Sequence, residues 1–181
     1  MPDTTPVLVV LGGLPGVGKS TVARALLARW PAVYLRIDTI EQALRDSGVL
    51  MGGDVGPAGY MAAYALARTQ LAQGLPVLAD SVNPLPVTRE AWRAVARDTR
   101  VPLLEVEVIC SDSAEHRRRV ETRVADVPAL VLPTWGGVVQ HDYIRWVGDR
   151  LVVDTASIDA EQAAARVLAA AQQRQRDCAH G

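Results

Sequence analysis

Cysteine is scarce in this sequence of 181 residues, and long apolar runs and an excess of charge of either sign are absent. The two cysteines, Cys110 and Cys178, form neither a metal-binding spacing nor a disulfide framework, so we expect a reducing, cytoplasmic setting. The apolar run at residues 7–11 is too short for a membrane span or a signal peptide. With a formal net charge of −1, the chain lacks the positive field that long nucleic acids favour, so smaller partners fit better.

The length predicts a single domain comprising residues 1–181. Apolar segments of strand length alternate with helical patterns, which is typical of an α/β protein with a parallel sheet. The strands are expected at residues 7–11, 32–37, 75–79, 103–110 and 150–154. The helices are expected at about residues 18–29, 39–46, 57–73, 88–99, 113–124, 134–146 and 159–175.

Composition adds detail to four of these regions. The strand at 7–11 has no polar face, so we expect it at the centre of the sheet, covered on both sides. Glu105 and Glu107 fall on one face of their strand, which should therefore begin partly exposed. Residues 47–60 are rich in glycine and predict a flexible loop, and the polar tail at about 172–181 is expected to fray.

Three of the predicted helices carry start signals. Thr39 with Gln42, and Asp112 with Glu115, have the spacing of a capping box, in which two side chains satisfy free amides at a helix start. Ser157 is a plausible N-cap for the last helix. We therefore expect these helices to begin just after Thr39, Asp112 and Ser157.

The stretch GGLPGVGKST, residues 12–21, contains the pattern G-x-x-x-x-G-K-S. An apolar strand leads into it and a helix follows, which is the context that a phosphate-binding loop (P-loop) needs. Backbone N–H groups and the positive helix end would cradle phosphates, Lys19 would bridge the β- and γ-phosphates, and the Ser20 hydroxyl would hold Mg²⁺. The predicted nucleotide-binding residues are Gly13, Leu14, Pro15, Gly16, Val17, Gly18, Lys19, Ser20 and Thr21.

Lysine occurs only in this loop. Of the 19 basic residues, 18 are arginine and one, Lys19, is lysine. A lysine at this single position indicates a need for a compact ammonium that reaches between phosphates. The scarcity of lysine also excludes the Asn-Lys-x-Asp signal of guanine-specific P-loop proteins, so ATP is expected rather than GTP.

Two carboxylates stand where predicted strands end, and ligands of doubly wound sheets bind at that edge. Asp38 can take the proton of an acceptor hydroxyl. Asp80 ends an apolar run in the manner of a Walker B aspartate and would hold Mg²⁺, although a turn-forming role is the alternative. Ser81 stands where hydrolysing ATPases usually carry a second acidic residue, which favours transfer to a bound acceptor.

These motifs resemble the small P-loop kinases that include chloramphenicol phosphotransferase, gluconate kinase, adenylylsulfate kinase and many bacterial predicted kinases. The likeness is strongest to the chloramphenicol phosphotransferase-like branch and rests on GGLPGVGKS (12–20), RIDTIEQAL (36–44) and LVVDT (151–155). It implies a three-layer α/β P-loop NTPase fold, a five-stranded parallel sheet in the order 2-3-1-4-5, and a small helical lid. In that branch, an aspartate matching Asp38 accepts the proton of the substrate hydroxyl.

Asp38 and Arg36 each allow two interpretations. An aspartate just before a helix is also a good N-cap, although Thr39 would compete for that place. Arg36 would point to the same side of its strand as Asp38. It would either hold an anionic group of the substrate or pair with Asp38.

An arginine-rich segment follows the fourth predicted strand. Arg119 and Arg123 share one face of the predicted helix and resemble lid arginines, which neutralise charge as the γ-phosphoryl group leaves. The alternative is a solvated helix with surface pairs such as Glu115 with Arg119. We expect a lid at about residues 112–135. His116 and His141 have no second metal ligand at suitable spacing and are interpreted as surface or structural residues.

Several residues are weaker candidates for contacting the phosphoryl acceptor or the base of the nucleotide. Asn83 and Tyr60 are candidates for contacting the acceptor, although Tyr60, like Tyr64, also suits the core. Three further aromatic residues would pack either near the nucleotide base or in the core: Trp135, Tyr143 and Trp146. The loop at 47–60 carries little charge, which suggests an acceptor that is not highly anionic.

The sequence therefore predicts an ATP- and Mg²⁺-dependent kinase that phosphorylates a hydroxyl of a small molecule, as a monomer or homodimer away from membranes. The predicted catalytic residues are Lys19, Asp38, Arg119 and Arg123, with Ser20 and Asp80 at the metal. One alternative is a nucleotide or nucleic-acid-end kinase, which needs an anion-binding acceptor pocket that Arg36 permits. Another is an ATP-binding regulatory switch without a small-molecule acceptor.

Overall fold

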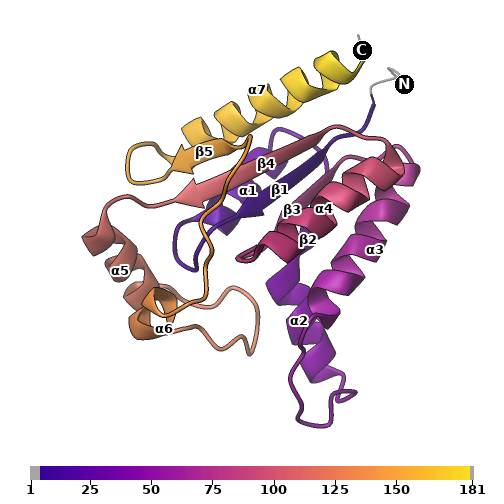
Figure 1. The fold of residues 1–181 in the computed structure, drawn as a ribbon. Helices are drawn as coiled ribbons and strands as arrows, with labels where there is room; N and C mark the ends of the chain where they lie inside the picture. Colours follow the sequence, from indigo (N-terminus) through magenta and orange to yellow (C-terminus); the bar gives the residue numbers. More distant parts are fainter. Residues whose placement is uncertain (1–4, 180–181) are drawn as a thin grey trace.

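The computed structural model describes residues 5–179 and contains five strands and seven helices in this part of the chain (Figure 1). The strands are β1 (Leu8–Gly12), β2 (Val33–Arg36), β3 (Val77–Asp80), β4 (Leu103–Ile109) and β5 (Leu151–Asp154). The helices are α1 (Lys19–Leu27), α2 (Ile37–Asp46), α3 (Ala58–Ala72), α4 (Pro86–Thr99), α5 (Ser113–Thr122), α6 (Trp135–Val139) and α7 (Ala160–Ala179).

All five strands are parallel and form one sheet in the order β2-β3-β1-β4-β5. Val10, in the middle of β1, is opposite Ala79 of β3 and Glu105 of β4. Every residue of β1 is buried, as its unbroken apolar sequence predicts for a central strand. The predicted fold class and strand order are confirmed.

Helices cover both faces of the sheet, which gives three layers (Figure 1). Val9 and Leu11 face α1 and α7, whereas Leu8 and Val10 face α3 and α4, so that two hydrophobic cores are separated by the sheet. Helices α5 and α6 lie beyond the carboxyl ends of the strands, beside the loop that follows β1 (Figure 1). The edge at which ligands of such sheets bind is therefore covered by a separate small helical unit.

The expectation that β4 begins exposed is wrong. Glu105 and Glu107 are both buried, and each carboxylate is paired with an arginine. Arg93 of α4 donates to Glu105 at 3.0 and 2.8 Å, and Arg150 donates to Glu107 at 2.6 Å. Burial raises the pKa of Glu105, and the hydrogen bonds from Arg93 offset part of that increase. The alternating pattern thus reflects two buried carboxylates that are each paired with an arginine, because buried carboxylates need such partners.

The capping box predicted at Thr39 and Gln42 does not form. Helix α2 begins at Ile37, directly after β2, where Ile37 packs into the core. Its N-cap residue is Arg36, with an extended backbone and no capping side chain. By contrast, Asp112 caps α5, accepting hydrogen bonds from two amides of the first turn. The reciprocal half of the predicted capping box does not form, because the Glu115 carboxylate binds Arg118 and Arg119 instead.

Helix α7 begins later than Ser157 predicts. Asp159 accepts a hydrogen bond from the Gln162 amide at 2.8 Å, and the Gln162 side chain accepts one from the Asp159 amide at 3.2 Å. Asp159 and Gln162 therefore form the capping box, two residues beyond the predicted N-cap. The helix continues through Ala179, so most of the tail expected to fray is helical, and residues 180–181 lie outside the described residues.

We expect Asp159→Ala to lower the free energy of unfolding by about 1 kcal/mol, because the substitution leaves an amide of the first turn without its acceptor. Ser157→Ala is the matched control, since the exposed Ser157 hydroxyl contacts only Asp154. Urea unfolding monitored by circular dichroism measures both variants. Equal stability of the two variants would contradict the assignment of the cap.

The helix predicted at 134–146 is reduced to the five residues of α6. Between α6 and β5 the chain forms no helix or strand and is held by Arg89 of α4, which is buried without a carboxylate partner. Its guanidinium donates to the carbonyls of Asn83, Pro84, Ile144 and Arg145 and lies 4.6 Å from the Trp146 ring centroid. Trp146 is thereby fixed in the core. Among residues 5–179, no helix is both long and apolar enough to cross a bilayer.

Candidate active site

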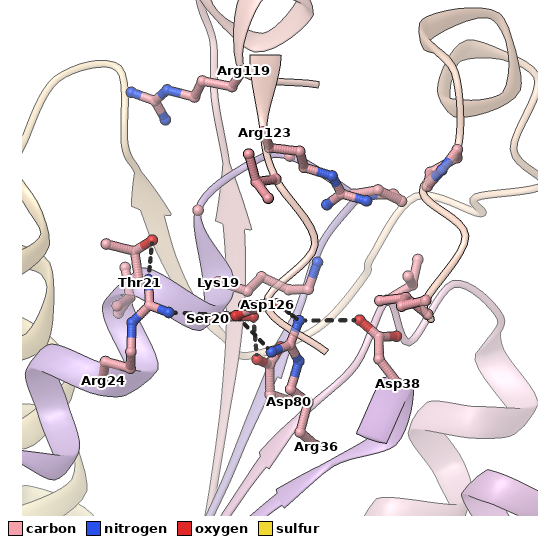
Figure 2. A pocket seen from close by; sticks show the side chains of 18 of the residues that line it. Lys19, Ser20, Thr21, Arg24, Arg36, Asp38, Asp80, Arg119, Arg123 and Asp126 are labelled. Atoms are coloured by element: carbon pink, nitrogen blue, oxygen red, sulfur yellow. Dashed lines mark hydrogen bonds and ion pairs between the residues drawn. The ribbon is translucent and has the colours of Figure 1, made fainter. Parts of the chain in front are cut away.

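A cavity of about 850 Å³ lies at the carboxyl edge of the sheet (Figure 2). Its walls come from the P-loop and α1, the start of α2, the end of β3, the segment from α5 to α6, and the loop after β5. The predicted site residues that line it are Gly18, Lys19, Ser20, Thr21, Arg36, Asp38, Asp80, Arg119 and Arg123, together with Pro15 and Gly16. Elements far apart in sequence therefore bring most of the predicted site together.

Glycine is required in the P-loop for two separate reasons. A side chain at Gly13 would place its Cβ 2.2 Å from the backbone oxygen of Val108, so the loop packs directly against β4. Gly18, the N-cap residue of α1, has φ = 97°, in the left-handed region that other residues adopt at a cost. These constraints turn the loop tightly back into α1.

The amides of the loop are available to an anion. Within residues 5–179, the backbone N–H groups of Gly16, Gly18, Lys19 and Ser20 donate to no protein acceptor. All four precede or begin α1, whose positive dipole end adds to their attraction for a negative group. Unpaired amides of this kind need an external acceptor, and phosphate oxygens suit them.

Lys19 extends along the loop from the first turn of α1. Its ammonium donates to the carbonyl oxygens of Gly13 at 2.8 Å and Leu14 at 3.0 Å. Desolvation lowers the pKa of Lys19, and the negative charges of Asp80 and Asp38 oppose that change. The ammonium is thus held by the loop's own backbone among the side chains that line the cavity (Figure 2).

Ser20 and Asp80 meet across the β1–β3 pair. The Ser20 hydroxyl donates to Asp80 Oδ2 at 2.8 Å, and the Tyr34 hydroxyl of β2 donates to the same oxygen at 2.7 Å. Burial raises the pKa of Tyr34, and the neighbouring Asp80 carboxylate raises it further. The Asp80 carboxylate therefore accepts hydrogen bonds from Ser20 and Tyr34 beside the cavity and does not cap a turn. Sequence analysis did not identify Tyr34, although it lies two residues before Arg36 and hence on the same side of β2.

Oxygen donors of this kind suit Mg²⁺, which commonly binds one or two protein oxygens together with phosphate oxygens of a nucleotide. In the described part of the chain, no cluster of three or more histidine, cysteine or carboxylate side chains could hold a metal by itself. Ser20 and Asp80, 2.8 Å apart beside the unpaired amides, fit a shared site of that type.

Asp38 lies in the first turn of α2 and lines the cavity. It is not the N-cap residue, so the alternative structural interpretation is not supported. Its side chain is 46% exposed, and its Oδ2 lies 3.6 Å from an Arg36 nitrogen, which is an ion pair without a hydrogen bond. The carboxylate is therefore accessible to a molecule in the cavity.

Arg36 makes its strong contact with a residue that sequence analysis missed. Its guanidinium donates to both carboxylate oxygens of Asp126, at 2.8 and 2.9 Å, and lies between Asp126 and Asp38 (Figure 2). Hydrogen bonding from Arg36 lowers the pKa of Asp126, although burial opposes the change. Asp126 lies 90 residues along the chain in the segment after α5, and no local pattern marks it.

The two predicted lid arginines have different surroundings. Arg119 donates to Glu115 at 2.7 Å and to the hydroxyl and carbonyl of Thr155 at 2.8 and 3.1 Å. The surface pair with Glu115 thus exists, but Arg119 also reaches the loop after β5. Hydrogen bonds from Arg118 and Arg119 lower the pKa of Glu115 to about 2. Arg123 ends α5, and within residues 5–179 its guanidinium has no hydrogen-bond or ion-pair partner.

His116 has a structural contact, in agreement with its predicted role. Its Nε2 donates to the Pro15 carbonyl at 2.8 Å, and its ring packs edge-on against Trp135 at 5.1 Å. The α5–α6 unit is thereby attached to the P-loop. His141 is exposed, and none of Trp135, Tyr143 and Trp146 lines the cavity.

Asn83 and Tyr60, the weaker acceptor candidates, are not in the cavity. Asn83 is fully buried, and its backbone N–H donates to the Tyr60 hydroxyl at 3.0 Å. Tyr64 is buried as well and packs edge-on against Trp92 at 4.6 Å. These side chains support the loop after β3, and we assign no acceptor contact to Asn83 or Tyr60.

Comparison with known proteins agrees with this architecture. A stretch of 109 residues, 54% of the chain, is 34% identical to an uncharacterised protein of Mycobacterium tuberculosis, and it covers only 22% of that relative. The M. tuberculosis APS kinase, solved with AMPPNP and APS, superposes with a TM-score of 0.67 at 18% identity over 92% of this chain and 98% of that one.

Two further structures share the fold. A gluconokinase from Sinorhizobium meliloti has a TM-score of 0.63 at 18% identity, with 94% of this chain and 97% of that one covered. Kti12 from Chaetomium thermophilum, solved with ADP-AlF3, has a TM-score of 0.68 at 22% identity, with coverages of 93% and 98%. The resemblance to P-loop small-molecule kinases is thus confirmed for the fold.

A family match covers the part of the chain that builds the site. Residues 8–137 match the sequence profile of the AAA domain, AAA_33. This range includes the P-loop, the first four strands and helix α5. Because the match spans most of the chain and the structure has the corresponding fold, the protein belongs to the AAA_33 family of AAA domains.

Proposed function

We propose that this protein transfers the γ-phosphoryl group of ATP to a hydroxyl of a small molecule. The observation that carries the proposal is the juxtaposition, in one cavity, of four unpaired P-loop amides, the Ser20–Asp80 pair and the accessible Asp38 carboxylate. The first two suit a metal-bound triphosphate, and the third suits an acceptor hydroxyl. The family membership and the kinase fold of the neighbours support the same conclusion.

The proposed role of each residue follows from its position. The amides and Lys19 bind the β- and γ-phosphates, and Ser20 and Asp80 hold Mg²⁺, which when bound neutralises phosphate charge. Asp38 orients the acceptor hydroxyl and takes its proton. Phosphoryl transfer needs little beyond positioning, charge neutralisation and such a base.

We assign the lid role to residues 112–135. Arg119 already bridges α5 and the loop after β5, and Arg123 projects its unpaired charge into the same cavity. Guanidinium groups bind phosphate oxygens in pairs, so these two arginines would stabilise the transferring group. The loop between α2 and α3 contributes no residue to the cavity lining, so we assign it no acceptor contact.

The proposal is tested by supplying Mg·ATP with pools of small hydroxyl compounds: neutral sugars, nucleosides, antibiotics, sugar acids and sugar phosphates. ADP release by the wild type is compared with release by Asp38→Asn, and products are examined by mass spectrometry. We expect one pool to stimulate only the wild type and to yield a product heavier by one phosphate. Tight AMPPNP binding without stimulation by any pool would instead favour an ATP-binding regulatory role.

Ser20→Ala should weaken Mg²⁺-dependent binding of AMPPNP by about tenfold, an effect typical of disturbed metal coordination. The variant loses a hydroxyl that donates to Asp80 and would bind the ion. Ser20→Thr retains the hydroxyl and should bind nearly as the wild type does. The measurement is calorimetry with and without Mg²⁺, and an unchanged Mg²⁺ dependence in Ser20→Ala would exclude this residue from the metal site.

A further inference from the structure

The contact between Arg36 and Asp126 has the geometry of ligand recognition. Both terminal nitrogens of Arg36 engage both oxygens of Asp126, at 2.8 and 2.9 Å. A guanidinium fork accepts a carboxylate, sulfate or phosphate group in the same two-point manner. The Arg36 side chain is only 14% exposed, whereas Asp126 is 42% exposed. Arg36 is therefore the fixed partner of the pair, and the Asp126 carboxylate is the partner that a ligand can displace.

Asp126 belongs to a segment with few other polar ties to the body of the domain. Within residues 124–133, hydrogen bonds to the rest of the described chain are made only by the Asp126 carboxylate, to Arg36 and, at 3.4 Å, to Arg24. Val127 adds a buried apolar contact. An anion that takes the place of Asp126 on Arg36 would release this part of the lid, and the long Arg24 contact is the one other described hydrogen bond to the domain that would break.

Positive charge is in excess where Asp126 docks. Arg123 lines the same cavity without an ion pair, and the Nε atoms of both Arg36 and Arg123 are buried without a hydrogen-bond partner. Desolvation lowers the pKa of Arg123, and the nearby Arg36 charge also lowers it, against the opposing effect of Asp38. Because unpaired buried charge is costly, departure of Asp126 would favour entry of another anion.

The fork also lies beside the proposed base. An Arg36 nitrogen is 3.6 Å from Asp38, so an anionic group on Arg36 would bring a neighbouring hydroxyl of the same molecule close to Asp38. We propose that Arg36, supported by Arg123, binds an anionic group of the phosphoryl acceptor, and that Asp126 occupies this subsite when the acceptor is absent. The acceptor is then a hydroxy compound that carries a carboxylate, sulfate or phosphate. This inference rests on the proposed kinase function.

Inorganic sulfate is the probe, titrated by calorimetry into protein saturated with Mg·AMPPNP so that the P-loop is already filled. In the wild type, sulfate can bind only to the fraction of molecules in which Asp126 has left Arg36, and its apparent affinity is reduced accordingly. Asp126→Asn should therefore bind sulfate about tenfold more tightly than the wild type. Asp126→Ala should show the same gain, and adding Arg36→Gln to either variant should remove it. AMPPNP binding by each variant reports whether the nucleotide site is intact.

Asp98→Asn is the matched control, because Asp98 also pairs with an arginine, Arg68 at 3.0 Å, but lies outside the cavity. Its sulfate affinity should equal that of the wild type. Sulfate affinity that is unchanged by both Asp126 variants, or a gain that survives Arg36→Gln, would overturn the proposal.

The acceptor screen separates this inference from the kinase function. Turnover stimulated by anionic hydroxy compounds, with a KM that rises in Arg36→Gln, would support both. Turnover with neutral compounds alone would support the kinase function and exclude the anion subsite. Tighter sulfate binding by the Asp126 variants, without turnover in any pool, would support the anion subsite and exclude the kinase function.

Discussion

Lys19→Ala should reduce phosphoryl transfer by about 10³-fold, which corresponds to roughly 4 kcal/mol of lost transition-state stabilisation. Lys19 is the single lysine of the chain, and its ammonium is held by the Gly13 and Leu14 carbonyls beside four unpaired amides. Its removal takes away the charge expected between the β- and γ-phosphates, so AMPPNP binding should weaken as well. Single-turnover transfer measures the first effect and calorimetry the second.

Lys19→Arg distinguishes charge from shape in this prediction. A planar guanidinium is larger than an ammonium and cannot donate to the two loop carbonyls in the same way, so this variant should also lose most of the transfer rate. Until an acceptor is known, slow hydrolysis of ATP provides the rate. A wild-type rate in Lys19→Ala, in protein with unchanged thermal stability, would show that Lys19 does not act on the phosphates.

Asp38→Asn should lower the transfer rate by about 10²- to 10⁴-fold, the range typical of a lost general base, while AMPPNP binding remains nearly unchanged. The amide preserves the size of the side chain but cannot accept the proton of the acceptor. The ion pair with Arg36 is long, at 3.6 Å, and Arg36 retains Asp126, so little structural change is expected. Parallel rate and binding measurements test both parts of the prediction.

Glu41→Gln is the matched control for Asp38. Glu41 lies one turn further along α2, lines the same cavity and pairs with Arg45 at 3.5 Å. Burial raises the pKa of Glu41, and Arg45 opposes that increase. We expect Glu41→Gln to have a much smaller effect on the rate than Asp38→Asn. The reverse order of effects would reassign the general base to Glu41.

Interactions between neighbouring residues were predictable only where no distant contact competed with them. Asp112 caps α5 as its spacing predicts, because α5 starts in an exposed region where local hydrogen bonding decides. At Thr39 the same signal failed, because the buried Ile37 drew the start of α2 back to the end of β2. Likewise, Glu105 and Glu107 look solvent-facing in sequence, and only the arginines packed over them explain their burial.

The sequence by itself determined the P-loop, the alternation of strands and helices and the central position of β1, because each depends on residues that are contiguous or follow a regular period. Only the tertiary structure decided which side chains share the cavity. Ser20 meets Asp80 across 60 residues, and Arg36 meets Asp126 across 90. Such pairs follow from strand order and from where the lid segment docks. Those depend on packing of the whole chain, which leaves no periodic signal at the individual residues.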